Sequence, residues 1–258
     1  MEEYIILRRK RIPYGMMNFA VIRRDDCYYV DKIRFIPMIE EADKFFFFIR
    51  PRRFGKSIFL SMLRAYYDIA QKEKFDKRFG NLWIGSHPTP MQGQYQVLYL
   101  DFSRASGGNG SLAENFDRYC SMAMDVFGKV YEPYYFPGYA KKMEAQPDFV
   151  SKLNYLNFHS AEYGAKLYLI IDEYDNFTNV VLNEQGNEIY HALTHASGFY
   201  REIFKSARLK QVYQVFVCRI GKFHTAHPLF SKISISSCVK TRKSNRAAAF
   251  LALPQRLS

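Results

Sequence analysis

Short, continuous apolar runs that alternate with segments of helical spacing constrain the fold of this chain most strongly. Runs of this length, rich in aromatic and branched residues, are typical of strands buried on both faces of a parallel sheet. The runs are residues 45–49, 97–102 and 167–171, with 211–218 as a candidate fourth strand. Helical spacing covers residues 57–71, 112–130, 139–163 and 188–207. Helices between successive strands predict an α/β fold with a parallel sheet.

Composition indicates a folded protein. Hydrophobic residues make up 48% of the 258 residues and aromatic residues 17%, more than a disordered chain contains. No apolar run reaches the roughly 18 residues that span a bilayer, and the opening MEEYIILRRKRIPYG lacks the cleavage site of a signal peptide. The four cysteines lie far apart without a C-x-x-C pair, which favours reduced thiols and a cytoplasmic location.

The positive charge is concentrated in the last quarter of the chain. Residues 1–200 hold 25 basic and 24 acidic residues, a difference of +1, whereas residues 201–258 hold 12 basic residues and one acid, a difference of +11. Two explanations remain open. Residues 203–258 are a basic arm that binds nucleic acid or another acidic partner, or the reading frame shifts near residues 207–219.

A candidate phosphate site follows the first apolar run, where residues 45–57 read FFFFIRPRRFGKS. Gly55, Lys56 and Ser57 end the P-loop pattern G-x-x-x-x-G-K-[ST], but Arg50 stands where the first glycine is expected. In a P-loop, backbone N–H groups and a helix N-terminus hold the phosphates. The lysine reaches the β- and γ-phosphates, and the hydroxyl ligates Mg²⁺. The triplet alone recurs by chance, but its place between a predicted strand and a predicted helix favours a phosphate site.

A candidate metal ligand ends the third apolar run, where residues 167–173 read LYLIIDE. An acid at this position, here Asp172, holds Mg²⁺ in nucleotide hydrolases, and a following acid, here Glu173, polarises the attacking water. The alternative is an apolar core strand that simply ends in a polar turn. Asp101, at the end of the second run, either points into the same site or caps the next turn.

Five segments carry a more specific pattern. They are IPYGMMNFAVIRRDDCYYVDKIRFI (12–36), FFFFIRPRRFGKSIFLSML (45–63), VLYLDFS (97–103), LYLIIDEYDNF (167–177) and GFYREIFK (198–205). Together they resemble the bacterial AAA-ATPase-like family of P-loop proteins, in which an arginine-proline-arginine-arginine loop is the normal form. The resemblance implies a P-loop NTPase fold, a three-layer α-β-α sandwich with a parallel central sheet.

The resemblance also implies a site that binds Mg²⁺ with ATP and hydrolyses the nucleotide. Glu173 would be the catalytic base, and Ser57 and Asp172 would hold the metal. The residues expected to bind the nucleotide are Arg52, Arg53, Phe54, Gly55, Lys56, Ser57 and Ile58. A partner or a neighbouring subunit of a homo-oligomer would complete the site. The alternatives are a nucleotide-regulated binding module without turnover and an inactive, truncated remnant.

The resemblance weakens after residue 207. Family members continue into a strand that ends in threonine-glycine-valine, then an acidic segment and commonly a nuclease-like domain, and this chain lacks these features. We therefore expect residues 1–44 to pack on an ATPase core at 45–207, followed by an atypical basic tail at 208–258. Under the frame-shift explanation, the core lacks its fourth strand.

Overall fold

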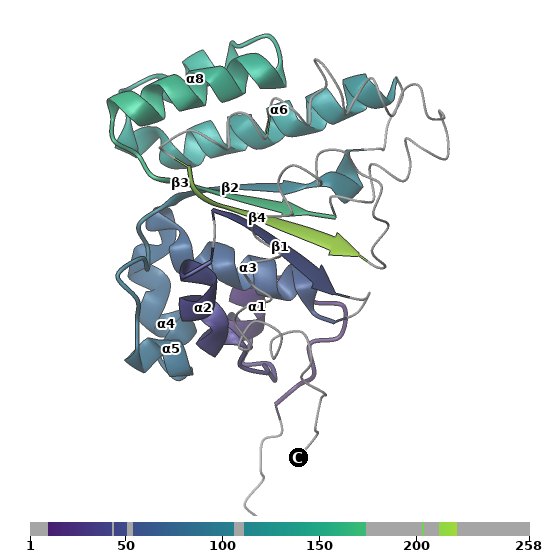
Figure 1. The fold of residues 1–258 in the computed structure, drawn as a ribbon, viewed down its shortest axis with the longest axis vertical. Coiled ribbons are helices and arrows are strands. Elements are labelled where there is room, and N and C mark those ends of the chain that lie inside the picture. The colour runs from purple at the N-terminus through teal and green to yellow at the C-terminus, as the bar shows by residue number, and fades with distance from the viewer. Residues whose placement is uncertain are drawn as a thin grey trace, which may run out of the picture.

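The computed structural model describes residues 10–42, 44–50, 54–105, 111–173, 203 and 212–220. Within them, a four-stranded parallel sheet carries helices on both faces (Figure 1). In this view α3 and its neighbours lie below the sheet, and α6 and α8 lie above it. No helix among these residues combines the length and apolar character that a membrane span requires. The predicted parallel sheet with helices between its strands is confirmed.

The strands follow the order β1-β4-β3-β2 across the sheet, and every neighbouring pair is parallel. The four strands are β1 (Phe45–Arg50), β2 (Gln96–Asp101), β3 (Leu167–Asp172) and β4 (Val212–Ile220). Val215 of β4 lies beside Phe45 of β1 on one side and Leu169 of β3 on the other. All four expected strands are therefore present, and β4 is an inner strand.

The position of β4 bears on the basic tail. The charge pattern assigns residues 212–220 to the tail, and the frame-shift explanation implies a core without a fourth strand. The structure instead pairs β4 with both β1 and β3. The boundary at residue 207 stays a prediction, but the sheet extends beyond it.

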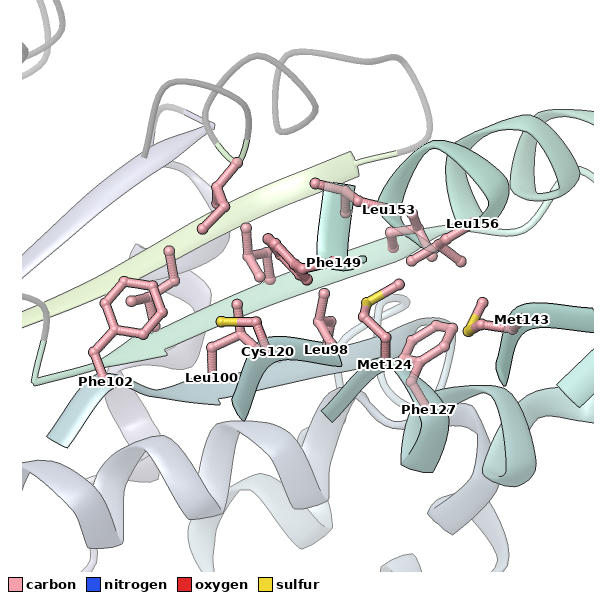
Figure 2. Close-up of a cluster of buried hydrophobic side chains, with 14 of the residues drawn as sticks. Leu98, Leu100, Phe102, Cys120, Met124, Phe127, Met143, Phe149, Leu153 and Leu156 are labelled. Atoms are coloured by element: carbon pink, nitrogen blue, oxygen red, sulfur yellow. The ribbon is translucent and has the colours of Figure 1, made fainter. Parts of the chain in front are cut away.

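Alternate residues of β2 and β3 are buried on opposite faces of the sheet. On one face, α3 (Lys56–Tyr67) packs against Phe48, Val97, Tyr168 and Ile170. On the other face, α6 (Leu112–Tyr131) and α8 (Phe149–Glu162) pack against Leu98, Leu100, Leu169 and Ile171 (Figure 2). Burial on both faces explains why the strands read as unbroken apolar runs.

Shorter elements connect these layers. They are α1 (Phe19–Arg24), η1 (Ile33–Phe35), α2 (Ile36–Glu40), η2 (Ile69–Lys74), α4 (Phe75–Phe79), α5 (Trp83–Ser86), η3 (Phe102–Arg104), η4 (Glu132–Tyr134) and α7 (Tyr139–Glu144). The predicted helix at 112–130 matches α6, which begins with a capping box formed by Ser111 and Glu114.

Two other predicted helices are longer than the observed ones. The helix expected at 57–71 ends at Tyr67, because Asp68 is extended and its backbone forms a bridge with Tyr95. The helix expected at 139–163 is divided into α7 and α8. Pro147 cannot donate the backbone hydrogen bond of a continuous helix, and Asp148 caps α8 instead. The helix expected at 188–207 lies outside the described residues except for residue 203.

The outer edge of β2 is covered by tyrosine hydroxyls from α6. The Val97 N–H donates to Tyr131 Oη at 2.9 Å, and the Asp101 N–H donates to Tyr119 Oη at 2.8 Å. Tyr131 in turn donates to the buried carboxylate of Asp68 at 2.9 Å. Edge N–H groups that another chain could pair with are thus satisfied within the protein.

Candidate nucleotide site

The carboxyl ends of β1 and β3 frame the candidate site. Parallel strands end at the same edge of a sheet, and open α/β sheets bind ligands there. β1 leads through residues 51–53, which lie outside the described residues, to Gly55 and α3. β3 ends at Asp172. With β4 between them, β1 and β3 are roughly 10 Å apart, twice the usual strand spacing.

Gly55 turns the chain into α3 in a left-handed conformation. It is the N-cap of the helix, with φ of 73°, and its carbonyl accepts the Phe59 N–H at 3.0 Å. A Cβ added here would meet nothing closer than Lys32 Nζ at 3.9 Å. The backbone angle, and not lack of space, therefore selects glycine. The sequence analysis did not identify Lys32, which places a second ammonium group beside this turn.

Lys56 is the first residue of α3, and its side chain is buried, with 6% of the residue exposed. A cation at this position faces the positive end of the helix dipole, which is unfavourable unless an anion lies nearby. The first turn of α3 contains no acidic residue. The position of Lys56 at the start of α3 is the one from which a P-loop lysine reaches the phosphates.

Ser57 and Asp172, the two residues predicted to hold a metal, line the same cleft, and their role as metal ligands stays a prediction. The Ser57 hydroxyl lies close enough to the Asp172 carboxylate to lower its pKa as a hydrogen-bond donor. Tyr99 Oη also donates to Asp172 Oδ2 at 3.0 Å, and the Glu173 N–H donates to Oδ1 at 2.9 Å. Asp172 is only 2% exposed. Its carboxylate is therefore held in one orientation by the ends of α3, β2 and β3.

Burial raises the pKa of Asp172 above its ordinary value, because an ionised carboxylate loses its hydration inside the protein. The hydrogen bonds from Tyr99 and Ser57 act in the opposite direction, and the charge of Asp101 raises the pKa further. Among the described residues, no ion pair balances the charge of the Asp172 carboxylate. A bound cation would supply the missing charge.

Glu173 has an unusual backbone conformation, with φ of 52°. For a residue other than glycine this costs about 1–3 kcal/mol, and such strain is found preferentially at functional sites. Glu173 directly follows the end of β3 and is half-buried. The conformation fixes the direction in which the chain leaves Asp172.

Asp101 and Asp172 are neighbours in the register of β2 and β3. Asp101 accepts the Ser103 N–H at 3.1 Å and caps η3, so the capping alternative describes its hydrogen bond. Arg104 also lies 3.3 Å from its carboxylate. Tyr99 was missed by the sequence analysis. Its spacing of two residues from Asp101 was the available signal, because such residues share one face of a strand.

A cleft of ≈ 470 Å³ begins at the pair and runs between α3 and α6. This volume lies within the range of ordinary ligand sites. The α3 wall contains Ser57, Ser61 and Arg64, and the α6 wall contains the exposed apolar residues Met122 and Val126. The Nε of Arg64 is buried without a hydrogen-bond partner among the described residues.

The remaining predicted site residues occupy different surroundings. Phe54 is 46% exposed immediately before Gly55, and Ile58 is half-buried on α3. Arg52 and Arg53 lie outside the described residues. The structure therefore brings together Gly55, Lys56, Ser57, Asp172 and Glu173.

The donor atoms of the pair fit a magnesium ion better than a transition metal. No cluster of three His, Cys, Asp or Glu side chains that could hold a metal occurs within the described ranges. Mg²⁺ prefers oxygen ligands and usually takes only one or two from the protein, the others being water and substrate phosphates. The Ser57 hydroxyl and the buried Asp172 carboxylate match this preference.

Comparisons with known proteins relate this chain to one family model and to one curated protein. A family model described as predicted AAA-ATPase matches residues 13–227. An uncharacterized protein in the vnfD 5′ region of Azotobacter chroococcum mcd 1 is 50% identical over 62 residues, which cover 24% of this chain and 12% of that protein. The match thus spans about an eighth of the relative's length. No solved structure shows significant similarity.

Proposed function

Since this chain belongs to the predicted AAA-ATPase family, we propose that it binds ATP with Mg²⁺ at the carboxyl edge of its sheet and hydrolyses the nucleotide to ADP and phosphate. The contact between Ser57 and Asp172 carries this proposal, because it joins the two predicted motifs at one point. The complete fold would be the three-layer P-loop sandwich, of which the parallel sheet and the helices on its two faces form the described part.

In this proposal each residue has a separate role. Backbone N–H groups at the start of α3 and the Lys56 ammonium bind the phosphates. Ser57 and Asp172 hold Mg²⁺, which neutralises charge on the phosphates when it is bound. Glu173 accepts a proton from the attacking water. Arg52, Arg53, Phe54 and Ile58 complete the nucleotide contacts.

The proposal extends to the rest of the chain in outline. Residues 1–44 pack on the ATPase core. The basic residues 203–258 contact nucleic acid or another acidic partner, and a homo-oligomer supplies what one copy lacks. Support for the first part comes from α1 and η1, because Phe19 and Ile33 are fully buried in the same cluster as α3.

Thermal unfolding with and without Mg-ATP tests the proposal. Ligand at about a hundred times its dissociation constant adds about 2.7 kcal/mol to the stability of the native state. We expect this shift in the natural chain and in Lys129→Ala, whose lysine lies on the exposed surface of α6. We expect no shift in Lys56→Ala. If the natural chain unfolds cooperatively but Mg-ATP leaves its melting temperature unchanged, ATP binding is disproved.

A further inference from the structure

A second concave surface, the basic groove, lies between α1 and the η2–α4 segment. Its volume is ≈ 220 Å³, and its lining is Asn18, Ala20, Val21, Arg23, Arg24, Lys74, Lys77 and Arg78. Five of these eight residues are basic and none is acidic. Residues 1–200 as a whole are nearly neutral, at 25 basic against 24 acidic residues. The groove therefore has a local excess of positive charge, whereas residues 1–200 as a whole are nearly neutral.

Four of the five cations in the groove form no ion pair within the described part of the chain. Lys74 and Lys77 are exposed and form no ion pair with any described residue. Arg24 is the exception, with its Nε 2.8 Å from Asp25 Oδ1. Elsewhere, by contrast, Lys10, Arg104, Lys129 and Lys152 each lie beside an acidic side chain.

The two arginines that shape the groove use neutral partners. Arg23 Nε donates to the Arg78 carbonyl at 2.8 Å, and its terminal nitrogen donates to the Asn81 side chain. Arg78 donates to the side-chain oxygen of Gln71. These contacts hold α1 against α4, and neither arginine forms an ion pair with a described residue, although the charges of Asp26 and Asp68 act on Arg23 and Arg78 from a longer distance. A concave surface with one sign of charge attracts counter-ions more strongly than a flat surface.

The lining favours an extended polyanion. Its only apolar members are the short side chains Ala20 and Val21, so it offers little to an acyl chain or an aromatic ring. Several separate cations suit a ligand with repeated negative charges, such as a phosphodiester backbone. We propose that the basic groove binds the backbone of single-stranded nucleic acid. This inference does not depend on ATP binding, although Asn18 lines both the groove and the cleft beside Asp172.

The test must separate the groove from the basic residues near the end of the chain. The full-length protein is titrated without nucleotide into a fluorescein-labelled oligothymidylate, and the affinity is measured by anisotropy over a range of salt. The groove variant is Lys74→Ala with Lys77→Ala. The control variant is Lys129→Ala with Lys141→Ala, which removes the same charge from exposed positions on α6 and α7.

Each phosphate contact contributes about 0.7 to the slope of log K against log salt for single strands. We expect the groove variant to reduce this slope by about 1.4, and the control variant to leave it unchanged. Trp83 is the only tryptophan of the chain and lies on α5, which packs beside α4. Its emission should change on binding in the natural chain and respond less in the groove variant.

Three outcomes would overturn the inference. The first two are that both variants reduce the slope equally and that neither variant reduces it. Either result would place the binding elsewhere on the chain. The third is that vesicles of phosphatidylserine and phosphatidylcholine bind in a groove-dependent way while the oligonucleotide does not. This result would show that the groove binds a membrane surface. The melting temperatures of both variants are measured as well. They show whether a smaller slope comes from the removed charge or from unfolding of the variant.

Discussion

The Ser57 hydroxyl lies beside the Asp172 carboxylate in one cleft and lowers its pKa as a hydrogen-bond donor, although Ser57 belongs to the first turn of α3 and Asp172 ends β3. This contact makes the two motifs a single site. The carboxylate is buried and has no ion-pair partner in the part of the chain that the structure describes. Function and stability should therefore oppose each other at Asp172, as they commonly do at active sites.

Asp172→Asn should raise the melting temperature of the ligand-free protein at neutral pH. Because the pKa of Asp172 is higher in the folded than in the unfolded state, ionisation of this group lowers stability as pH rises through that window. The amide removes the penalty, so the gain should shrink as pH falls through the raised pKa towards the ordinary value of 3.8. Circular dichroism melts at neutral pH and near pH 5 measure this effect.

The same variant should lose the stabilisation by Mg-ATP. Asp76→Asn, at an exposed carboxylate on α4, is the control and should change stability by less than about 0.5 kcal/mol. A lower melting temperature in Asp172→Asn at neutral pH would contradict the account of its burial.

Glu173→Gln should reduce ATP turnover about 10²–10⁴-fold, the usual contribution of a general base, while Mg-ATP still raises the melting temperature. Phosphate release and thermal shift, measured on one preparation, separate an ATPase from a binding module. Undiminished turnover in this variant would remove Glu173 from the mechanism. If neither protein hydrolyses ATP but both bind it, the binding-module alternative is supported.

Glu173→Gly tests the strained backbone separately from the carboxylate. Glycine adopts a φ of 52° without the steric penalty of a Cβ. We expect this variant to lose turnover like Glu173→Gln but to be more stable than it by about 1 kcal/mol in urea unfolding. Equal stability of the two variants would show that the left-handed conformation stores no strain.

Gly55→Ala should destabilise the protein by about 1–2 kcal/mol and abolish the Mg-ATP shift, because alanine resists a φ of 73° at the start of α3. Gly138→Ala is the matched control. Gly138 has φ of 87°, caps α7 and has open space around the position of a Cβ. Its replacement should lower stability similarly in urea unfolding but preserve the ligand shift. A preserved shift in Gly55→Ala would separate this turn from nucleotide binding.

Tyr131→Phe should destabilise the protein by about 1–3 kcal/mol, because it leaves the Val97 N–H without its acceptor and removes one of the hydrogen bonds to the buried Asp68 carboxylate, which keeps those from Ala70 and Gln71. Tyr134→Phe, at a neighbouring exposed tyrosine, should have almost no effect. Urea unfolding of both variants measures the difference. Similar midpoints would mean that water replaces the Tyr131 hydroxyl.

The sequence was sufficient to predict the strands, because burial on both faces makes a strand such as β3 an unbroken apolar run. It also predicted α6 from the spacing of its apolar residues, although this spacing does not show the capping box at the start of the helix. Helix ends were less predictable. Asp68 stops α3 by pairing with Tyr95, a tertiary contact that helical spacing does not encode.

The candidate site was predictable to a similar extent. Gly55-Lys56-Ser57 and Asp172 follow from motifs, whereas their contact depends on the strand order. The strained φ of Glu173 leaves no distinct mark on composition or period, and the hydrogen bond from Tyr99 is signalled only by the spacing of two residues between Tyr99 and Asp101. Both arise from the way in which β2 and β3 end side by side.

The strand order has a consequence for how the chain reaches its native state during synthesis. β4 is the last described strand to leave the ribosome, yet it lies between β1 and β3. Until residues 212–220 emerge, the strand that leads to Gly55 has no neighbour in the described sheet, and β2 and β3 can pair only with each other. Such late, long-range pairing slows folding and prolongs the exposure of apolar strand edges. Nascent chains that stop short of β4 should therefore depend on chaperones and be rapidly degraded.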